Sequence, residues 1–137
     1  GIEKRIQREK ITNVKYKGSV EKQEVPGILQ KSDINLVHWK NMDILKYGYS
    51  YNKLFEYLAA GRPVFSTVHT EHSIIRKNNC GIETEGYTPK EFATEVKSIF
   101  HMPKEQREQM GKNAKEAAKQ YDFSVLTERL IKIVEML

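Results

Sequence analysis

The residues whose types and spacing could do chemistry lie in a loop and at the start of a helix near the middle of the chain. No Asp or Glu occurs between Ile44 and Phe55, whereas Lys46 flanks the loop and Lys53 falls in the first turn of the expected helix. A cation there opposes the helix dipole and costs roughly a few tenths of a kcal/mol unless an anion lies beside it. Exposed amides at a helix start, together with a Lys, make a phosphate site. A Lys53 that simply points into solvent is the alternative.

A carboxylate follows one turn further along the same helix. Glu56 lies four residues after Asn52, so the two share a face, while Leu54, Phe55 and Leu58 fall on the side toward the core. A carboxylate in this position is badly placed to bind phosphate. It is well placed to accept hydrogen bonds from a vicinal diol such as a ribose. An ordinary surface Glu on a helix is the alternative.

A sheet is needed to position these side chains, and the apolar pattern predicts one. The mostly apolar run at 34–39 is typical of a strand buried on both faces of a parallel sheet. The helix at 52–60 ends at Gly61, which suits a C-cap, and Arg62 in the same turn is expected to have a surface role. Strands alternating with helices predict an α/β domain, in which ligands bind outside the carboxyl ends of the strands. The remaining elements of this part are expected at 64–67 (strand), 73–78 (helix) and 81–83 (strand).

Capping residues and apolar spacing also predict the elements on either side of this central part. Thr88-Pro89-Lys90-Glu91 is a strong helix start, with a Thr cap and Glu three residues later. Apolar residues then recur at helical spacing, at Phe92, Val96, Ile99 and Phe100. Because the chain opens inside a helix with no strand before it, we expect the sheet to be truncated at its N-terminal strands. The other expected elements are 1–11 (end of a helix), 14–17 (short strand), 25–31 (helix), 103–119 (helix) and a last helix from about Asp122.

Composition bounds the class of protein. A chain of 137 residues, 39% of them hydrophobic, suffices for one domain, taken as 1–137. The single Cys80 cannot form an internal disulfide, which favours a reducing, cytoplasmic setting over secretion. The four His show no metal-ligand spacing, and no apolar run approaches the ~20 residues of a membrane span. The net charge of +5 favours anionic partners without naming one.

One long run resembles a known family. It comprises Ser50, then Lys53-Leu54-Phe55-Glu56-Tyr57-Leu58-Ala59-Ala60-Gly61-Arg62-Pro63-Val64. This run is similar to the S-x-x-K-L-F-E-Y-L-A-A-G-[RK]-P-V segment of retaining GT-B glycosyltransferases (family 4), especially bacterial enzymes that assemble capsular, exopolysaccharide and O-antigen chains. Four further segments resemble the family in order and spacing: 13–18 (its N-V-x-F-x-G strand), 25–29 with 32–34 (its helix followed by A-D-[IV]), 79–81 (its N-C-G turn) and 110–114 with 121–123 (its closing helices).

The resemblance implies a fold and a site. The fold would be the Rossmann-like C-terminal domain of a GT-B enzyme, the half that binds the nucleotide-sugar donor. Glu56 would bind the ribose, and the helix start would face the diphosphate. The resemblance implies a UDP-sugar in preference to a GDP-sugar, retention of configuration and no catalytic metal or other cofactor. The residues implied for the diphosphate are Ser50, Tyr51, Asn52 and Lys53, and those implied for the base are Ser19, Val20 and Glu21.

Two departures from the family pattern matter. Many members carry a first Glu that contacts the donor sugar, and Gly48 stands in its place here, so Tyr49 is the expected sugar contact. The diphosphate-gripping Arg and Lys of the family, and its acceptor-binding domain, fall upstream of Gly1. We therefore expect this chain to be a fragment that does not catalyse transfer by itself.

Two other functions stay open on the sequence. Sugar-nucleotide 2-epimerases share the GT-B architecture, so fold alone does not exclude one. A non-catalytic basic module that binds nucleic acid or a membrane would use the pI near 9.2, but no recognition-helix, RNP-like or zinc pattern accompanies the charge, so nucleic acid is not expected as a partner. A peripheral position of the parent enzyme at the inner face of the membrane is compatible with the glycosyltransferase interpretation.

Overall fold

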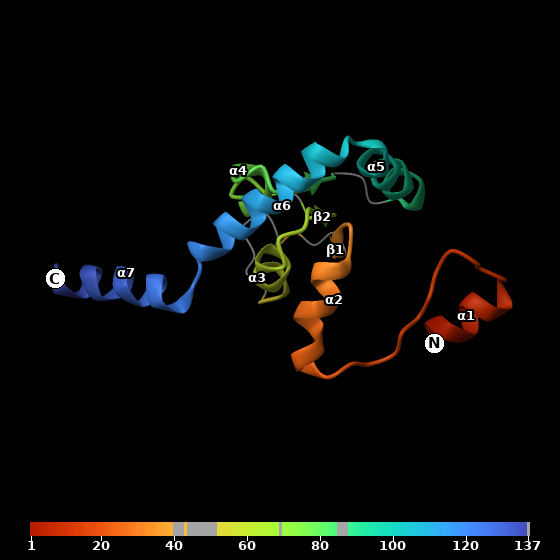
Figure 1. Ribbon diagram of the computed structural model, residues 1–137, viewed down its shortest axis with the longest axis horizontal. Helices are drawn as coiled ribbons and strands as arrows, with labels where there is room; N and C mark the ends of the chain where they lie inside the picture. Colours follow the sequence, from red (N-terminus) through yellow and green to blue (C-terminus); the bar gives the residue numbers. More distant parts are fainter. Residues whose placement is uncertain (40–42, 44–51, 69, 85–87, 137) are drawn as a thin grey trace.

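The computed structural model describes residues 1–39, 43, 52–68, 70–84 and 88–136. Its centre is a parallel sheet of three strands in the order β1 (Asn35–Val37), β2 (Val64–Ser66) and β3 (Gly81–Glu83). Asn35 pairs with Val64, which in turn pairs with Gly81, so the three strands begin at the same level. The sheet and its flanking helices confirm the α/β class (Figure 1).

Helices cover both faces of the central strand. On one face, α3 (Asn52–Ala59) packs against α6 (Lys104–Lys119), while α4 (Ile74–Lys77) joins β2 to β3. On the other face, α5 (Pro89–His101) brings the Phe92 ring to 5.3 Å from the ring of Phe65 on β2. Since β1 and β2 are parallel, the chain must return between them, and α3 therefore begins on the side of the carboxyl ends of the strands.

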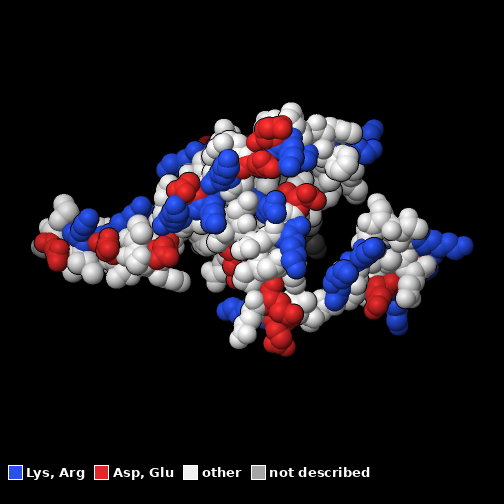
Figure 2. Space-filling model, in the orientation of Figure 1, with Lys and Arg blue, Asp and Glu red and all other residues white. Residues whose placement is uncertain are grey.

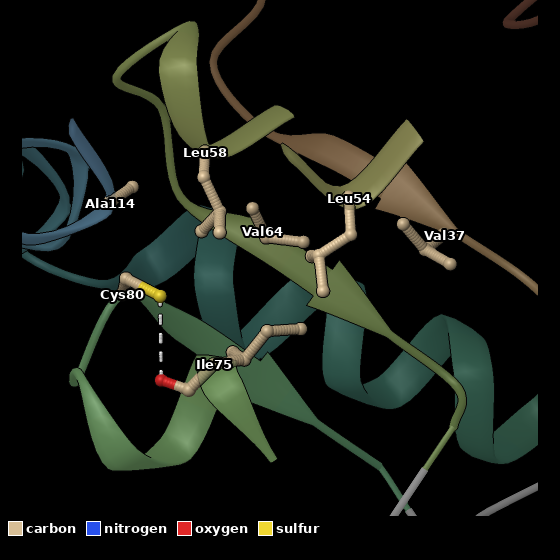
Figure 3. Close-up of a cluster of buried hydrophobic side chains, with 7 residues drawn as sticks. All are labelled: Val37, Leu54, Leu58, Val64, Ile75, Cys80 and Ala114. Carbon is tan, nitrogen blue, oxygen red and sulfur yellow. Dashed lines mark hydrogen bonds between the residues drawn. The ribbon is translucent and has the colours of Figure 1, made fainter. Parts of the chain in front are cut away.

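The core lies between the sheet and the α3–α6 layer (Figure 3). Leu54 and Leu58 of α3 are 2% and 0% exposed, as their helical spacing predicts. Phe55 is only half-buried, with its ring 5.2 Å from that of Tyr121. The side chains that pack together come from the strands, α3, α4 and α6: Val37, Leu54, Leu58, Val64, Ile75, Cys80 and Ala114. This packing fixes the direction of α3, and with it the positions of Lys53 and Glu56.

Two glycines set how closely α6 approaches α3. Gly61 ends α3 at a φ of +69°, where its amide donates to the Leu58 carbonyl at 3.0 Å, which confirms the expected cap. Gly111 of α6 lies against that turn, and a Cβ at this position would overlap the carbonyl oxygen of Gly61. A side chain at position 111 would therefore force the helix and the turn apart.

Most of the other expected elements are confirmed. The helix α2 (Val25–Lys31) lies where it was expected. Thr88 and Glu91 form the expected capping box at the start of α5. Asp122 caps α7 (Phe123–Glu135), and α1 (Ile2–Arg8) and a short 3-10 turn, η1 (Lys22–Glu24), precede α2. Figure 1 shows α1 set apart from the sheet by an extended segment, and α7 extending away from the sheet at the other end of the chain.

Three expectations are wrong. Residues 14–17 form no strand, because no strand lies beside them to pair with their N–H and C=O groups in the described structure. The run at 34–39 forms a strand only at β1, and this strand is not buried on both faces. Leu36 is 44% exposed, since α5 covers Phe65 on β2 but not Leu36, its neighbour on the edge strand. The apolar face expected for α5 is also incomplete, because Phe100 is 74% exposed while Ile99 is buried.

The last helix carries its apolar residues on the outside. The side chain of Leu130 is 61% exposed and that of Phe123 is 87% exposed, and α7 has no buried residue. Within the described ranges, no helix combines the length and the apolarity needed to cross a bilayer.

Candidate functional site

The start of α3 is open to solvent. Asn52 and Lys53 are both exposed, while Leu54 anchors the first turn in the core. The first turn contains no acidic residue, and Lys53 forms no ion pair within the part of the chain that the structure describes. The first amides of any α-helix have no partner inside the helix. The start of α3 and the Lys53 cation thus lie together at the carboxyl side of the sheet, where Asn52 and Lys53 are exposed.

Glu56 lines a groove between α2 and α3, which we call the α2–α3 groove. Its volume is about 230 Å³. The carboxylate is exposed, and together with burial, the larger cause, it raises the pKa of the neighbouring Tyr57. The walls are mostly apolar, and the lining residues are Lys22, Val25, Pro26, Leu29, Gln30, Glu56, Ala59 and Ala60. A carboxylate at the edge of an apolar groove can accept hydrogen bonds from hydroxyl groups of a ligand that packs in it.

The residues expected near the base lie beside this groove. Ser19, Val20 and Glu21 are exposed and directly precede Lys22, which lines the groove with Glu56. Glu21 has a local role as well: its side chain accepts from the Glu24 amide, and its own amide donates to Glu24 Oε2 at 3.2 Å. The structure therefore brings the end of this segment close to Glu56, although 19–21 do not themselves line the groove.

Three of the expected site residues fall outside the described residues. They are Tyr49, Ser50 and Tyr51, and the same holds for Gly48, which stands where the family has its first Glu. The contacts expected for Tyr49 with the sugar and for Ser50 and Tyr51 with the diphosphate remain predictions. Of the expected diphosphate residues, only Asn52 and Lys53 have described positions.

Sequence reasoning missed a hydrogen-bonded group at the carboxyl ends of β1 and β2. The hydroxyl of Thr67, which is 1% exposed, accepts from the Trp39 amide at 3.1 Å and lies 3.1 Å from Nδ1 of His38. The His38 ring also meets the edge of the Phe92 ring, with centroids 6.3 Å apart. These contacts join the end of β1 to β2, although His38 and Trp39 are themselves exposed. The sequence holds no local signal for Thr67, because its partners lie 28 and 29 residues away.

A buried carboxylate at the end of β3 was also missed. The side chain of Glu83 is fully buried, where Oε1 accepts from the Ser73 hydroxyl and Oε2 lies 3.1 Å from Nε of Arg76. Arg76 also donates to the Thr70 carbonyl, and the Ser73 hydroxyl caps α4 by accepting from the Arg76 amide at 3.1 Å. Since Glu83 contacts both Ser73 and Arg76, it ties α4 to the end of β3.

One further side chain bears on chemistry. Cys80 is completely buried, its Sγ lies 3.5 Å from the Ile75 carbonyl oxygen (Figure 3), and burial raises the pKa of its thiol to about 11. Cys80 thus packs in the core as a small residue. Among the described side chains, no cluster of three His, Cys, Asp or Glu could hold a metal ion.

Comparison with known proteins identifies the family. Neither the curated proteins nor the solved structures contain a significant match to this chain. The family described as glycosyl transferase-like matches residues 3–130, which is nearly the whole chain and includes α3 and the α2–α3 groove. The parallel α/β sheet agrees with a Rossmann-like glycosyltransferase domain. The chain belongs to the glycosyl transferase-like family.

Proposed function

We propose that this chain binds the nucleotide-sugar donor of a glycosyl transfer reaction, with the diphosphate at the start of α3 and the ribose at Glu56. The observation that carries the proposal is the placement of Glu56 in the α2–α3 groove, one turn beyond the open helix start that presents Lys53. Membership of the glycosyl transferase-like family supports the reaction class.

Electrostatics support the diphosphate end of the site. The N-terminus of a helix carries about half a positive charge, and it favours an anion by roughly 0.3–1 kcal/mol when exposed. Lys53 adds a full charge in the same turn, and no acid in that turn offsets it. A nucleoside diphosphate bound there would remove the unfavourable interaction between the cation and the helix dipole.

The spacing along α3 supports the ribose end. Glu56 follows Lys53 by three residues, which is about 4.5 Å along a helix axis. This is on the scale of the separation between the α-phosphate of a nucleotide and the hydroxyl groups of its ribose. The carboxylate has two oxygens for those hydroxyls, and the apolar walls formed by Val25, Pro26 and Leu29 provide surface against which a ligand packs.

The finer features of the proposal come from the family resemblance. The donor is a UDP-sugar in preference to a GDP-sugar, and the sugar passes to an acceptor hydroxyl with retention of configuration in polysaccharide or glycoconjugate synthesis. Departure of the nucleoside diphosphate leaves negative charge on its terminal phosphate. The dipole of α3 and Lys53 stabilise that charge in the role that a metal ion plays in other enzymes.

The test is a titration of the chain with UDP and with GDP, followed by calorimetry and by amide NMR. Loss of hydrogen bonds to a charged group costs about 1.5–3 kcal/mol, so Glu56→Ala should weaken binding by about 10- to 150-fold. Glu128→Ala is the matched control, because Glu128 is an exposed helical Glu on α7, away from the groove. Nucleotide-induced shifts are expected at 19–22 and 52–56. Shifts elsewhere only, or equal affinity of the two variants, would refute the donor site.

Transfer and epimerisation differ in their products. The family match favours transfer, since it names glycosyl transferases over residues 3–130. With the full-length parent enzyme, the donor and a set of acceptor sugars, a glycosylated acceptor is the expected product. An epimerised sugar nucleotide with no change in the acceptor would instead identify a 2-epimerase.

A further inference from the structure

A second concave surface lies at the opposite end of the sheet from the start of α3. We call it the amino-edge cleft, because Asp33 and Pro63 in its wall lie one or two residues before the starts of β1 and β2. Its volume is about 510 Å³, within the roughly 300–1,000 Å³ of small-molecule sites. The lining residues come from the ends of α2 and α3 and from one face of α6: Gln30, Asp33, Ala60, Gly61, Arg62, Pro63, Lys104, Arg107, Glu108, Gly111, Lys112 and Lys115.

Positive charge dominates the amino-edge cleft. Five cationic side chains line it against two carboxylates, those of Asp33 and Glu108. Figure 2 shows Lys and Arg side chains gathered over α6, with fewer acidic side chains between them. Only Lys104 has an acidic partner, Glu108 at 3.6 Å; the other four cations of the cleft form no ion pair within the described ranges. The charge inside the cleft is therefore largely uncompensated by the protein.

Backbone carbonyls hold the two arginines of the cleft in place. Nε of Arg62 donates to the Gln30 carbonyl at 2.7 Å, and Nη1 of Arg107 donates to the carbonyls of Phe100 at 3.0 Å and Met102 at 2.7 Å. Both are half-buried, so Arg62 does more than occupy the surface position that its turn predicts. Each guanidinium has further N–H groups beyond those used here, and a fixed planar fork of donors suits phosphate oxygens.

The fold also keeps the cleft open and its lysines together. Lys104, Lys112 and Lys115 occupy one face of α6, because their spacing follows the helical repeat. Gly111 lies between them, where its missing side chain lets α6 contact the Gly61 turn, so that the lysines of α6 and the arginine at position 62 line one cavity. These cations therefore belong to one site rather than to separate surface positions.

From this arrangement we propose that the amino-edge cleft is a second anion site, one that binds a phosphate-bearing group distinct from the donor diphosphate. Two preset guanidinium groups provide directed hydrogen bonds to phosphate oxygens, and the lysines supply charge that adapts to the position of the group. The ligand class is a di- or polyphosphate ester, because a single phosphate would fill only a part of the 510 Å³ and meet only some of the cations. The site stands whether or not the donor site at α3 is correct.

The experiment titrates the chain with inorganic pyrophosphate at low ionic strength, with amide NMR and calorimetry as readouts. Lys112→Gln combined with Lys115→Gln should weaken binding at the cleft about three- to tenfold, since each exposed ion pair contributes modestly. Lys90→Gln combined with Lys97→Gln is the matched control. It removes the same charge from exposed positions on α5, outside the cleft, and should change the affinity by less than about twofold.

A third variant separates this proposal from the donor site. Pyrophosphate could also bind at the start of α3, so Lys53→Gln is expected to reduce shifts at 52–56 and to leave those at 104–115 unchanged. The amino-edge site is overturned if pyrophosphate shifts no amide in 104–115, or if the cleft variant and its control bind equally well. If pyrophosphate shifts amides in 104–115 of the unsubstituted chain but none at 52–56, only the donor site is refuted.

Vesicles identify the source of the phosphate group. Vesicles of phosphatidylglycerol and phosphatidylcholine are mixed with the chain and floated on a gradient, with the same two double variants. Flotation reduced in the cleft variant but not in its control indicates a lipid headgroup as the ligand. Pyrophosphate binding without flotation indicates a soluble phosphate compound. Flotation reduced equally by both variants would refute the lipid source and indicate nonspecific attraction of a basic protein.

Discussion

Replacing Gly111 by Ala tests the close approach of α6 to the end of α3. In an unobstructed helix, this change stabilises by roughly 0.8–1 kcal/mol, because Ala loses less backbone freedom on folding. Here the new Cβ would overlap the Gly61 carbonyl oxygen, and it would lie 3.2 Å from the Gly61 carbonyl carbon and 3.5 Å from Cα of Arg62. These are backbone atoms, which cannot rotate out of the way, so the helix or the turn must move.

The expected result follows from the difference between the two effects. Overpacking costs typically about 1–3 kcal/mol, and displacement of α6 also loosens the contact between the buried Ala114 and α3. After subtraction of the helix propensity, Gly111→Ala should lower the free energy of unfolding by up to about 2 kcal/mol. For a chain of this size the melting temperature should fall by roughly 3–5 °C for each kcal/mol.

Gly27 offers a matched control for the same substitution. It lies in α2, and a Cβ there meets nothing within 4 Å, so Gly27→Ala should stabilise the protein by up to about 1 kcal/mol. Urea denaturation of both variants and the wild type, with the slopes compared to check that the transition is unchanged, gives the signs. A Gly111→Ala protein at least as stable as the wild type would contradict the close packing of α6 against the Gly61 turn.

Further predictions concern the core and the buried thiol. Leu58→Ala should cost about 2–5 kcal/mol in urea denaturation, whereas Leu130→Ala, at a side chain 61% exposed, should stay within about 0.5 kcal/mol; equal effects would contradict their burial. Cys80 should react with iodoacetamide at pH 8 at least about a hundredfold more slowly in the native than in the denatured chain, since its native pKa is about 11. The same raised pKa contributes stability that is complete below about pH 8.5 and is lost as the pH rises toward 11, which urea titrations across that range measure.

The sequence was sufficient to predict the features that depend only on residues close together along the chain. The Gly61 cap and the Thr88–Glu91 capping box are local patterns, and both appear where they were expected. The strands β2 and β3 also lie at their expected positions.

The sequence was not sufficient where the structure depends on which distant segments of the chain pack against each other. Val14 and Tyr16 alternate with lysines as strand residues do, but alternation says only which face would be buried, not whether a pairing strand exists. Leu36 lies in an apolar run, yet its exposure depends on how far α5 extends across the sheet. The periodicity of α7 shows an apolar face without showing that anything covers it.

The candidate sites also divide into features that nearby residues determine and features that depend on distant segments. Lys53 and Glu56 could be selected from charge and helical spacing alone. The α2–α3 groove could not, because its walls come from segments that are roughly thirty residues apart and meet only in the folded chain. The amino-edge cleft is more remote still, since Arg62 and the cations of α6 are separated by β2, α4, β3 and α5.

Gln30 and Ala60 line both the α2–α3 groove and the amino-edge cleft, so these two residues form a partition between the two cavities. NMR signals of these two residues will respond to a ligand on either side and cannot report which one is occupied. Any displacement of the partition by one ligand alters the room left for the other. By thermodynamic reciprocity, the two affinities must then change by the same factor, and a double titration measures that factor directly.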